Sequence, residues 1–185
     1  FGTAMEADAR RFIGEAGGQV FGSVRHPQAT ADFSSFLLQA QASKAKVIGL
    51  ANAGNDTILA VRAAADFGIV SGGQKVAAML TFLSDIHALG LKTAQGLQLT
   101  ESFYWNLNDG TRAWSKRFGD RMNGRMPTMV HAGVYSALTH YLKAVKAAGS
   151  TDADKVAAAM RDIPVSDAVL PKASVRQDGD RKSTR

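Results

Sequence analysis

Small and polar residues interrupt an apolar run in the segment VIGLANAGNDTILAVRAAADFG, Val47 to Gly68. Asn52, Ala53 and Gly54 stand at the break, and the residues after them have the pattern of a helix. Small side chains let a ligand approach the backbone closely. The start of the following helix offers free N–H groups and a partial positive charge, which suit a carboxylate. The segment therefore predicts a ligand contact here, and the alternative is a tight turn with an N-cap at Asn55.

Two further segments carry polar or aromatic side chains where an apolar run ends. Thr81 is followed by Asp85, which could pair with an ammonium group or accept hydrogen bonds from a ligand. The alternative role for Asp85 is that of a helix N-cap. Phe103, Tyr104 and Trp105 are consecutive aromatic residues, whose rings would alternate between the two faces of a strand. One or two of these rings could line a cleft, and the alternative is packing in the core or at a hinge.

The histidines do not have the spacing of a catalytic or metal site. Asp85 and His87 are too close along a helix for their side chains to face each other. His131 and His140 diverge around one predicted helix, and His26 has no carboxylate near it in the sequence. The chain has no cysteine and none of the phosphate-loop, nucleophile-elbow or HExxH motifs. We therefore expect no catalytic residue, no metal, no cofactor and no enzyme activity.

Composition narrows the class of protein further. The chain has 185 residues, of which 45% are apolar and 21% charged, so it can build a sizeable core. The net charge of +6 lies mainly beyond residue 100 and is spread over helices and a polar tail, which argues against a nucleic-acid partner. The apolar runs are too short to span a bilayer. Because the chain begins at Phe1, we expect it to start inside a larger protein, and a targeting signal would lie outside it.

Helical and strand patterns alternate through the first hundred residues. The predicted strands are residues 19–26, 46–53, 74–83 and 96–105, with helices before and between them. Parallel strands need crossovers of about a dozen residues, and these helices supply them. The fold class expected is α/β, with a doubly wound parallel sheet in a three-layer αβα arrangement.

After Trp105 the pattern is almost entirely helical. Asn108 or Asp109 is expected to cap one helix, and Pro127 or Thr128 to begin a long one that ends at Gly149. Ser150 or Thr151 is expected to cap a third helix. The apolar faces of these helices need a partner that this region does not supply. We expect that partner to be missing from the fragment or to come from a second copy.

Three segments of the chain resemble the periplasmic solute-binding proteins of branched-chain amino acid-type ABC transporters. They are AQGLQLTESFYWNLNDGTRAWSKRF, MPTMVHAGVYSALTHYLKAVKAAG and, above all, DFSSFLLQAQASKAKVIGLANAG. The resemblance covers residues 1 to about 170. It implies a type I periplasmic-binding fold, in which two α/β lobes joined by a hinge close on a small ligand. The chain resembles the C-terminal half of such a protein, with the first lobe incomplete.

The resemblance implies three regions. Residues 1–102 would form the second lobe, and residues 103–170 the helical part of the first lobe after a hinge crossing. Residues 171–185 would be a polar tail, for which disorder is one interpretation. This tail keeps an arginine–acid–glycine turn of the family type but lacks the apolar strand that follows it there.

The resemblance also carries site residues over by position. Phe1 matches an aromatic residue at the cleft lip, and the strand end at Asn52, Ala53 and Gly54 matches a ligand contact. The region from Thr81 to Asp85 matches the place of an acidic group for the amine of the ligand. The hinge or cleft lining is assigned to Tyr104, Trp105 and Met129.

The function implied is that of a periplasmic component of an ABC importer. It would bind a small amino acid, an aliphatic or aromatic acid, or an amide, and present it to a membrane permease. The alternative is a ligand-sensing domain of a receptor or regulator with the same fold. A lone second lobe offers half a cleft, so the fragment is expected to bind weakly or not at all unless copies self-associate.

Overall fold

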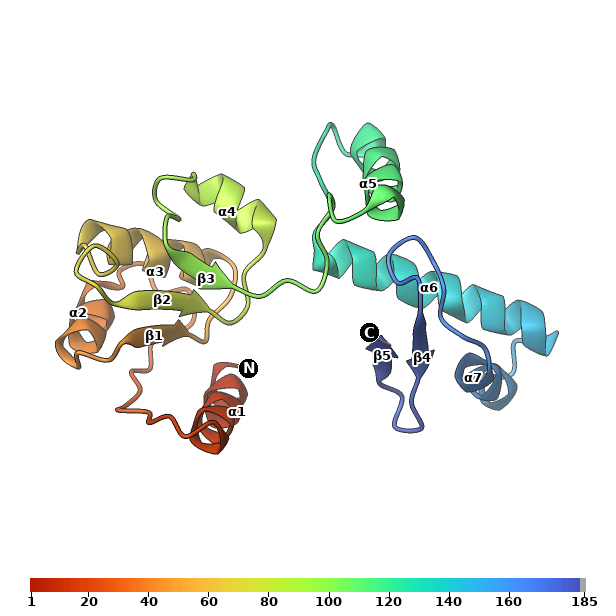
Figure 1. Ribbon diagram of the computed structural model, residues 1–185, viewed down its shortest axis with the longest axis horizontal. Helices are drawn as coiled ribbons and strands as arrows, with labels where there is room; N and C mark the ends of the chain where they lie inside the picture. Colours follow the sequence, from red (N-terminus) through yellow and green to blue (C-terminus); the bar gives the residue numbers. More distant parts are fainter. Residues whose placement is uncertain (184–185) are drawn as a thin grey trace. The chain divides into compact units, whose positions relative to one another are not determined.

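The structure, a computed structural model, describes residues 1–183, and the chain divides into two compact units, Phe1–Thr100 and Glu101–Arg185. The first unit contains the parallel sheet, and the second contains three helices and a short hairpin (Figure 1). Each unit is described by itself below.

The first unit alternates helices with parallel strands. Its elements are α1 (Gly2–Glu15), α2 (Ser34–Ala42), β1 (Val47–Leu50), α3 (Asn55–Asp66), β2 (Lys75–Ala78), α4 (Leu83–Leu89) and β3 (Leu97–Leu99). The strands lie in the order β1-β2-β3 and all run parallel, with Leu50 opposite Ala78 and Ala78 opposite Leu99. Helices α3 and α4 are the crossovers that parallel pairing requires. The α/β class and the parallel sheet are therefore confirmed.

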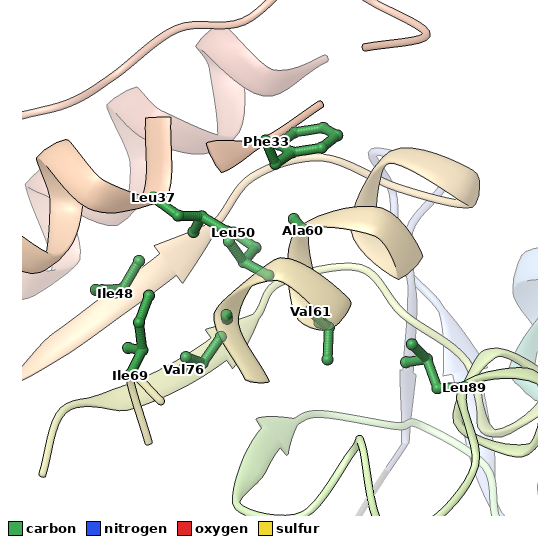
Figure 2. Close-up of a cluster of buried hydrophobic side chains, with 10 residues drawn as sticks. Phe33, Leu37, Ile48, Leu50, Ala60, Val61, Ile69, Val76 and Leu89 are labelled. Atoms are coloured by element: carbon green, nitrogen blue, oxygen red, sulfur yellow. The ribbon is translucent and has the colours of Figure 1, made fainter. Parts of the chain in front are cut away.

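One face of this sheet is buried beneath the helices. Ile48 and Leu50 alternate along β1 with exposed neighbours, and the buried Val76 and Ala78 of β2 flank the half-buried Ala77. Figure 2 shows side chains from α2, α3 and α4 gathered with the strand residues in one cluster: Phe33, Leu37, Ala60, Val61 and Leu89. Each fully buried aliphatic or aromatic side chain of this kind contributes about 1.5–3 kcal/mol.

The other face of the sheet is largely open. Val47, Gly49 and Lys75 point to this face and are exposed. Helix α1 has no buried residue. Within the first unit, these positions of the sheet are therefore left exposed.

The strand predicted for residues 19–26 is not observed. A strand requires backbone hydrogen bonds to a neighbour, and none of the strands in the described part of the chain pairs with this segment. The other three predicted strands are found at the expected places but are shorter, three or four residues each.

The extended segment that replaces this strand is tied to α1. Glu6 of α1 forms an ion pair with Arg25, with 3.3 Å between Oε2 and the guanidinium nitrogen. A hydrogen bond from the Ser23 side chain, and then one from Arg10, hold the pKa of Glu6 below its ordinary value. The segment that ends at His26 therefore has fixed contacts without belonging to the sheet.

The second unit consists of α5 (Asp109–Arg121), α6 (Met129–Ala148), α7 (Ala153–Asp162), β4 (Ala173–Val175) and β5 (Arg181–Ser183). Its core is an aromatic cluster in which Phe103 meets Trp114 edge-on, with 5.4 Å between ring centroids. Tyr135 of α6 packs on Trp114 at 5.1 Å. Trp114 itself is buried.

The helix ends agree only in part with the sequence patterns. Asn108 caps α5, and its side-chain oxygen accepts a hydrogen bond from the Thr111 N–H at 2.9 Å. Gly149 ends α6 in the left-handed conformation. The cap predicted at Ser150 or Thr151 is wrong, because the side chain of Asp152 accepts the hydrogen bond from the Lys155 N–H at the start of α7.

The beginning of α3 also differs from the expectation. Gly54, rather than Asn55, is the N-cap of α3. Asp32 accepts hydrogen bonds from the Ser34 hydroxyl and backbone N–H at the start of α2, and these lower the pKa of Asp32. This contact stabilises the fold when the pH is above the ordinary pKa of an aspartate. The stabilisation is lost as the pH falls through the lowered pKa of Asp32.

The C-terminal segment contains regular structure, in contrast to the expected polar tail. Strands β4 and β5 pair antiparallel, with Val175 opposite Arg181. The Arg176–Asp180 turn joins them, with Gly179 at φ 86° and the Arg176 N–H donating to the Asp180 carbonyl at 2.7 Å. The predicted arginine–acid–glycine turn is thus a hairpin turn. The last two residues of the predicted tail lie outside the described residues.

No helix within residues 1–183 has both the length and the apolar character needed to cross a membrane.

Candidate functional site

The carboxyl ends of β1 and β2 bring the predicted contact residues to one edge of the sheet. The two strands are parallel neighbours with Leu50 opposite Ala78, so the residues that follow them leave the sheet at the same end of the strands. Asn52 follows β1, and Thr81 follows β2. In open parallel sheets this edge is where ligands bind.

Asn52 is held by side chains on both sides of it. Its side-chain nitrogen lies 3.2 Å from Nε2 of His26, and its side-chain oxygen accepts a hydrogen bond from Oγ1 of Thr57 at 2.9 Å. Thr57 belongs to α3 and is fully buried, whereas Asn52 itself is half-buried. The amide therefore stands at the boundary between the core and the surface.

Ala53 and Gly54 form the turn into α3. Ala53 is half-buried and Gly54 is exposed. Gly54 has φ 59° and ψ −133°, a conformation that only glycine adopts without strain. Its carbonyl accepts the Ile58 N–H, which begins the hydrogen-bond ladder of α3. The turn and the small residues predicted from the sequence are thus both present, and the backbone here is accessible.

Thr81 and Asp85 are bonded to each other and to the start of α4. The Asp85 carboxylate accepts the Phe82 N–H at 2.9 Å and the Thr81 hydroxyl at 3.3 Å. Thr81 is only 1% exposed, while Asp85 is half-buried. Asp85 is not itself the N-cap of α4, which is Phe82, but its Oδ2 satisfies a backbone donor at the helix start. Its assignment as a ligand contact stays a prediction.

Phe1 precedes α1 beside the same edge. A Cβ atom on Gly2 would lie 3.0 Å from the carbonyl oxygen of Ala51, so the start of α1 lies directly against the residue before Asn52. The Phe1 side chain is 67% exposed. Gly2 and Ala51 are therefore near neighbours in space, although 49 positions separate them in the sequence.

Tyr104, Trp105 and Met129 lie in the second unit. Trp105 and Met129 are partly buried against the cluster of Phe103 and Trp114. Tyr104 is exposed, with its ring 5.7 Å from that of Trp105. Their assignment to a hinge or cleft remains a prediction.

Each unit also has a hollow away from this site. In the first unit, a hollow of about 470 Å³ opens between α3 and the start of β3, lined by Ala64, Val76 and Gly96. In the second, one of about 500 Å³ lies along α5 beside Trp105 and Ser115. Neither includes Asn52 or Ala53. The strand-end residues Asn52, Ala53 and Gly54 are called the rim below, and they lie outside these two hollows.

His26 is the residue at this rim that sequence reasoning missed. We looked for a carboxylate partner near His26 in the sequence, but its partner is the amide of Asn52, 26 residues further along. No local pattern signals that contact. Within residues 1–183, no group of three or more histidine, aspartate or glutamate side chains is placed to hold a metal ion.

Comparison with known proteins gives the family. The family model described as "Periplasmic binding protein" matches residues 1–184. A periplasmic binding protein of Burkholderia mallei is 49% identical, with a TM-score of 0.91, over 98% of this chain and 48% of that one. A branched chain amino acid ABC transporter periplasmic ligand-binding protein of Burkholderia xenovorans LB400 is 45% identical, with a TM-score of 0.84, over 97% of this chain and 48% of that one.

A third solved structure shares the fold at lower identity. It is an ABC transporter solute-binding protein of Rhodopseudomonas palustris HaA2 in complex with p-hydroxybenzoic acid. It is 22% identical, with a TM-score of 0.81, over 94% of this chain and 48% of that one. A comparison with curated proteins finds no match. The chain spans about half the length of the solved relatives, and with the family model matched along almost all of its residues it belongs to the periplasmic binding protein family.

Proposed function

We propose that the chain is part of an extracytoplasmic solute-binding protein of an ABC importer. Its ligand would be a small amino acid, an aliphatic or aromatic acid, or an amide, held between two lobes that close on it. The protein would hand this ligand to a membrane permease without changing it chemically. The observation that carries the proposal is the match of the family along residues 1–184.

The rim at the carboxyl ends of β1 and β2 supports this proposal. Asn52 offers a fixed amide, and Ala53 and Gly54 leave the backbone at the start of α3 open to a ligand. The first turn of a helix has free N–H groups, which suit a carboxylate. Phe1 adds an exposed ring beside them. These groups can hold one side of a small polar ligand, and the first lobe would hold the other.

A chimera tests the proposal, because a single lobe offers only half a cleft. The chain would be joined to the part of the Burkholderia mallei relative that it does not match. Thermal unfolding would then be followed with leucine, glutamine and 4-hydroxybenzoate as probes. A ligand present at a hundred times its Kd stabilises the folded state by about 2.7 kcal/mol, which raises the Tm by several degrees.

Two substitutions sharpen the test. Asn52→Ala removes the amide at the rim and should weaken binding of the responding probe about fivefold, the effect of one lost hydrogen bond. Gln39→Ala, which removes an exposed amide from α2, should leave binding unchanged. Equal affinity in all three proteins would contradict the assignment of the site. Release of a chemically altered probe would contradict the role in transport.

A further inference from the structure

The ring of His26 is fixed in place by its neighbours. It is half-buried and meets Phe33 edge-on, with 4.7 Å between centroids and 71° between the ring planes. A second edge contact, with Phe36, has a centroid distance of 5.9 Å. Phe33 is itself a buried member of the core. The plane of the imidazole is thus set by aromatic packing, so its two nitrogens point in defined directions.

The contacts of the two ring nitrogens define which one carries the proton. Nδ1 lies 2.7 Å from the carbonyl oxygen of Pro27, and a carbonyl can only accept, so Nδ1 carries a hydrogen. In the neutral ring Nε2 is then an acceptor. The Asn52 nitrogen, 3.2 Å away, donates to it.

Thr57 completes the arrangement from the other side. Its hydroxyl donates to the Asn52 side-chain oxygen at 2.9 Å. If the Asn52 amide were turned over, its oxygen would face the lone pair of His26 Nε2, and the hydrogen bond from Thr57 would be lost. The chain Pro27–His26–Asn52–Thr57 therefore admits one orientation of the amide when the imidazole is neutral.

We infer that His26 is a positioning residue, which fixes the orientation of Asn52 at the rim. An amide has two N–H donors and two acceptor lone pairs, and this network uses one of each. The remaining N–H donor and the remaining acceptor lone pair of Asn52 then have fixed positions and do not swap places. A ligand would be recognised by a donor and an acceptor in a set order. This role in recognition rests on the proposed function, whereas the orientation itself does not.

Nitrogen NMR of the 185-residue chain tests the orientation without any ligand. At mildly alkaline pH the His26 ring should show a protonated Nδ1 and an unprotonated Nε2. The Asn52 side-chain amide should exchange its protons with water slowly. In His26→Ala that exchange should quicken about fivefold, as expected for one lost hydrogen bond.

Rescue by a conservative variant separates positioning from general stability. In His26→Gln the side-chain oxygen can take the place of Nε2 as acceptor, and slow exchange should return. In His26→Asn the side chain is too short to reach Asn52, and exchange should stay fast. His87→Ala, which removes an exposed histidine from α4, is the matched control and should change nothing at Asn52.

The possible outcomes are distinct. A proton on Nε2 of the unmodified chain overturns the inference even if the alanine variant fails to fold. So does an Asn52 amide that exchanges equally fast with and without His26. If the ring and amide signals are as expected but the chimera binds no probe, the orientation stands and the proposed function fails.

Discussion

Asn52 shows what a local pattern reveals about a site residue and what it leaves out. The break in the apolar run predicted a polar residue at a strand end, and the structure places Asn52 there. The partners that orient it, His26 and Thr57, are 26 and 5 residues away. The contact with His26 depends on how the extended segment lies along α3 and β1, and single-sequence spacing carries no information about that.

Thr81 and Asp85 make the same point for a pair of neighbours. Their spacing suited either a ligand contact or a helix start, and the sequence left both open. The structure has Oδ2 of Asp85 bonded to the Phe82 N–H, with Thr81 buried beside it. The backbone donors at the start of α4 need an acceptor wherever the helix begins, and Asp85 supplies one. The ligand contact stays a prediction.

The first prediction concerns Thr57, whose hydroxyl holds the Asn52 oxygen. Thr57→Val keeps the shape of the side chain and removes the donor. We expect the free energy of unfolding to fall by about 1 kcal/mol, because the half-buried Asn52 oxygen loses its partner. Urea unfolding measures this. The control is Thr3→Val, at an exposed position of α1, and equal stability of the two variants would contradict the prediction.

Secondary-structure elements were easiest to predict where partners are close in the sequence. Strands β1, β2 and β3 follow one another in the sheet in chain order, and their apolar runs identified all three. The segment of residues 19–26 has the same kind of pattern but no partner strand within the described ranges. Strand formation depends on a neighbour that the pattern of the segment itself does not specify.

Helix boundaries were less certain because several residues in succession can act as caps. Before α7 the sequence offers Ser150, Thr151 and Asp152, all of which are good N-cap residues. In the structure the N-cap is Asp152, with φ −61° and ψ 130°. Its Oδ1 lies 3.1 Å from the backbone nitrogen of Lys155. The choice depends on where the loop after Gly149 turns into the helix.

The second prediction tests this boundary. Asp152→Ala should lower the free energy of unfolding by about 1 kcal/mol, the usual cost of losing an N-cap side chain. Thr151→Ala, one residue earlier and exposed, should cost only a few tenths of a kcal/mol. Denaturant unfolding of the two variants compares them directly. A larger loss for Thr151→Ala would place the helix start one residue earlier than the structure does.

At the scale of the whole molecule, α6 presents an apolar surface without a covering partner in its unit. The side chains that form it recur every four residues and are between 50% and 64% exposed: Val130, Val134, Leu138 and Leu142. Contiguous exposed patches of this kind on soluble proteins usually mark a surface that another chain or lobe covers. Sequence patterns predicted that the helices after Trp105 need such a partner.

The third prediction follows from this surface. We expect the isolated chain to self-associate as its concentration rises and to bind a dye specific for exposed apolar groups. Light scattering coupled to size exclusion measures the first property, and dye fluorescence the second. Val134→Lys combined with Leu138→Lys should reduce both, whereas Ala158→Lys on α7 should not. A monomer at all concentrations, with no dye signal, would contradict the expectation.

The unpaired edge of β1 bears on how this chain would aggregate. Because β1 pairs with β2 on one side only, its other side carries backbone groups that could template a further strand. Fibril-forming segments are about six or seven residues long, however, and β1 has four, with a glycine among them. The edge strand is thus shorter than such a segment, so we expect no fibril to start from this edge.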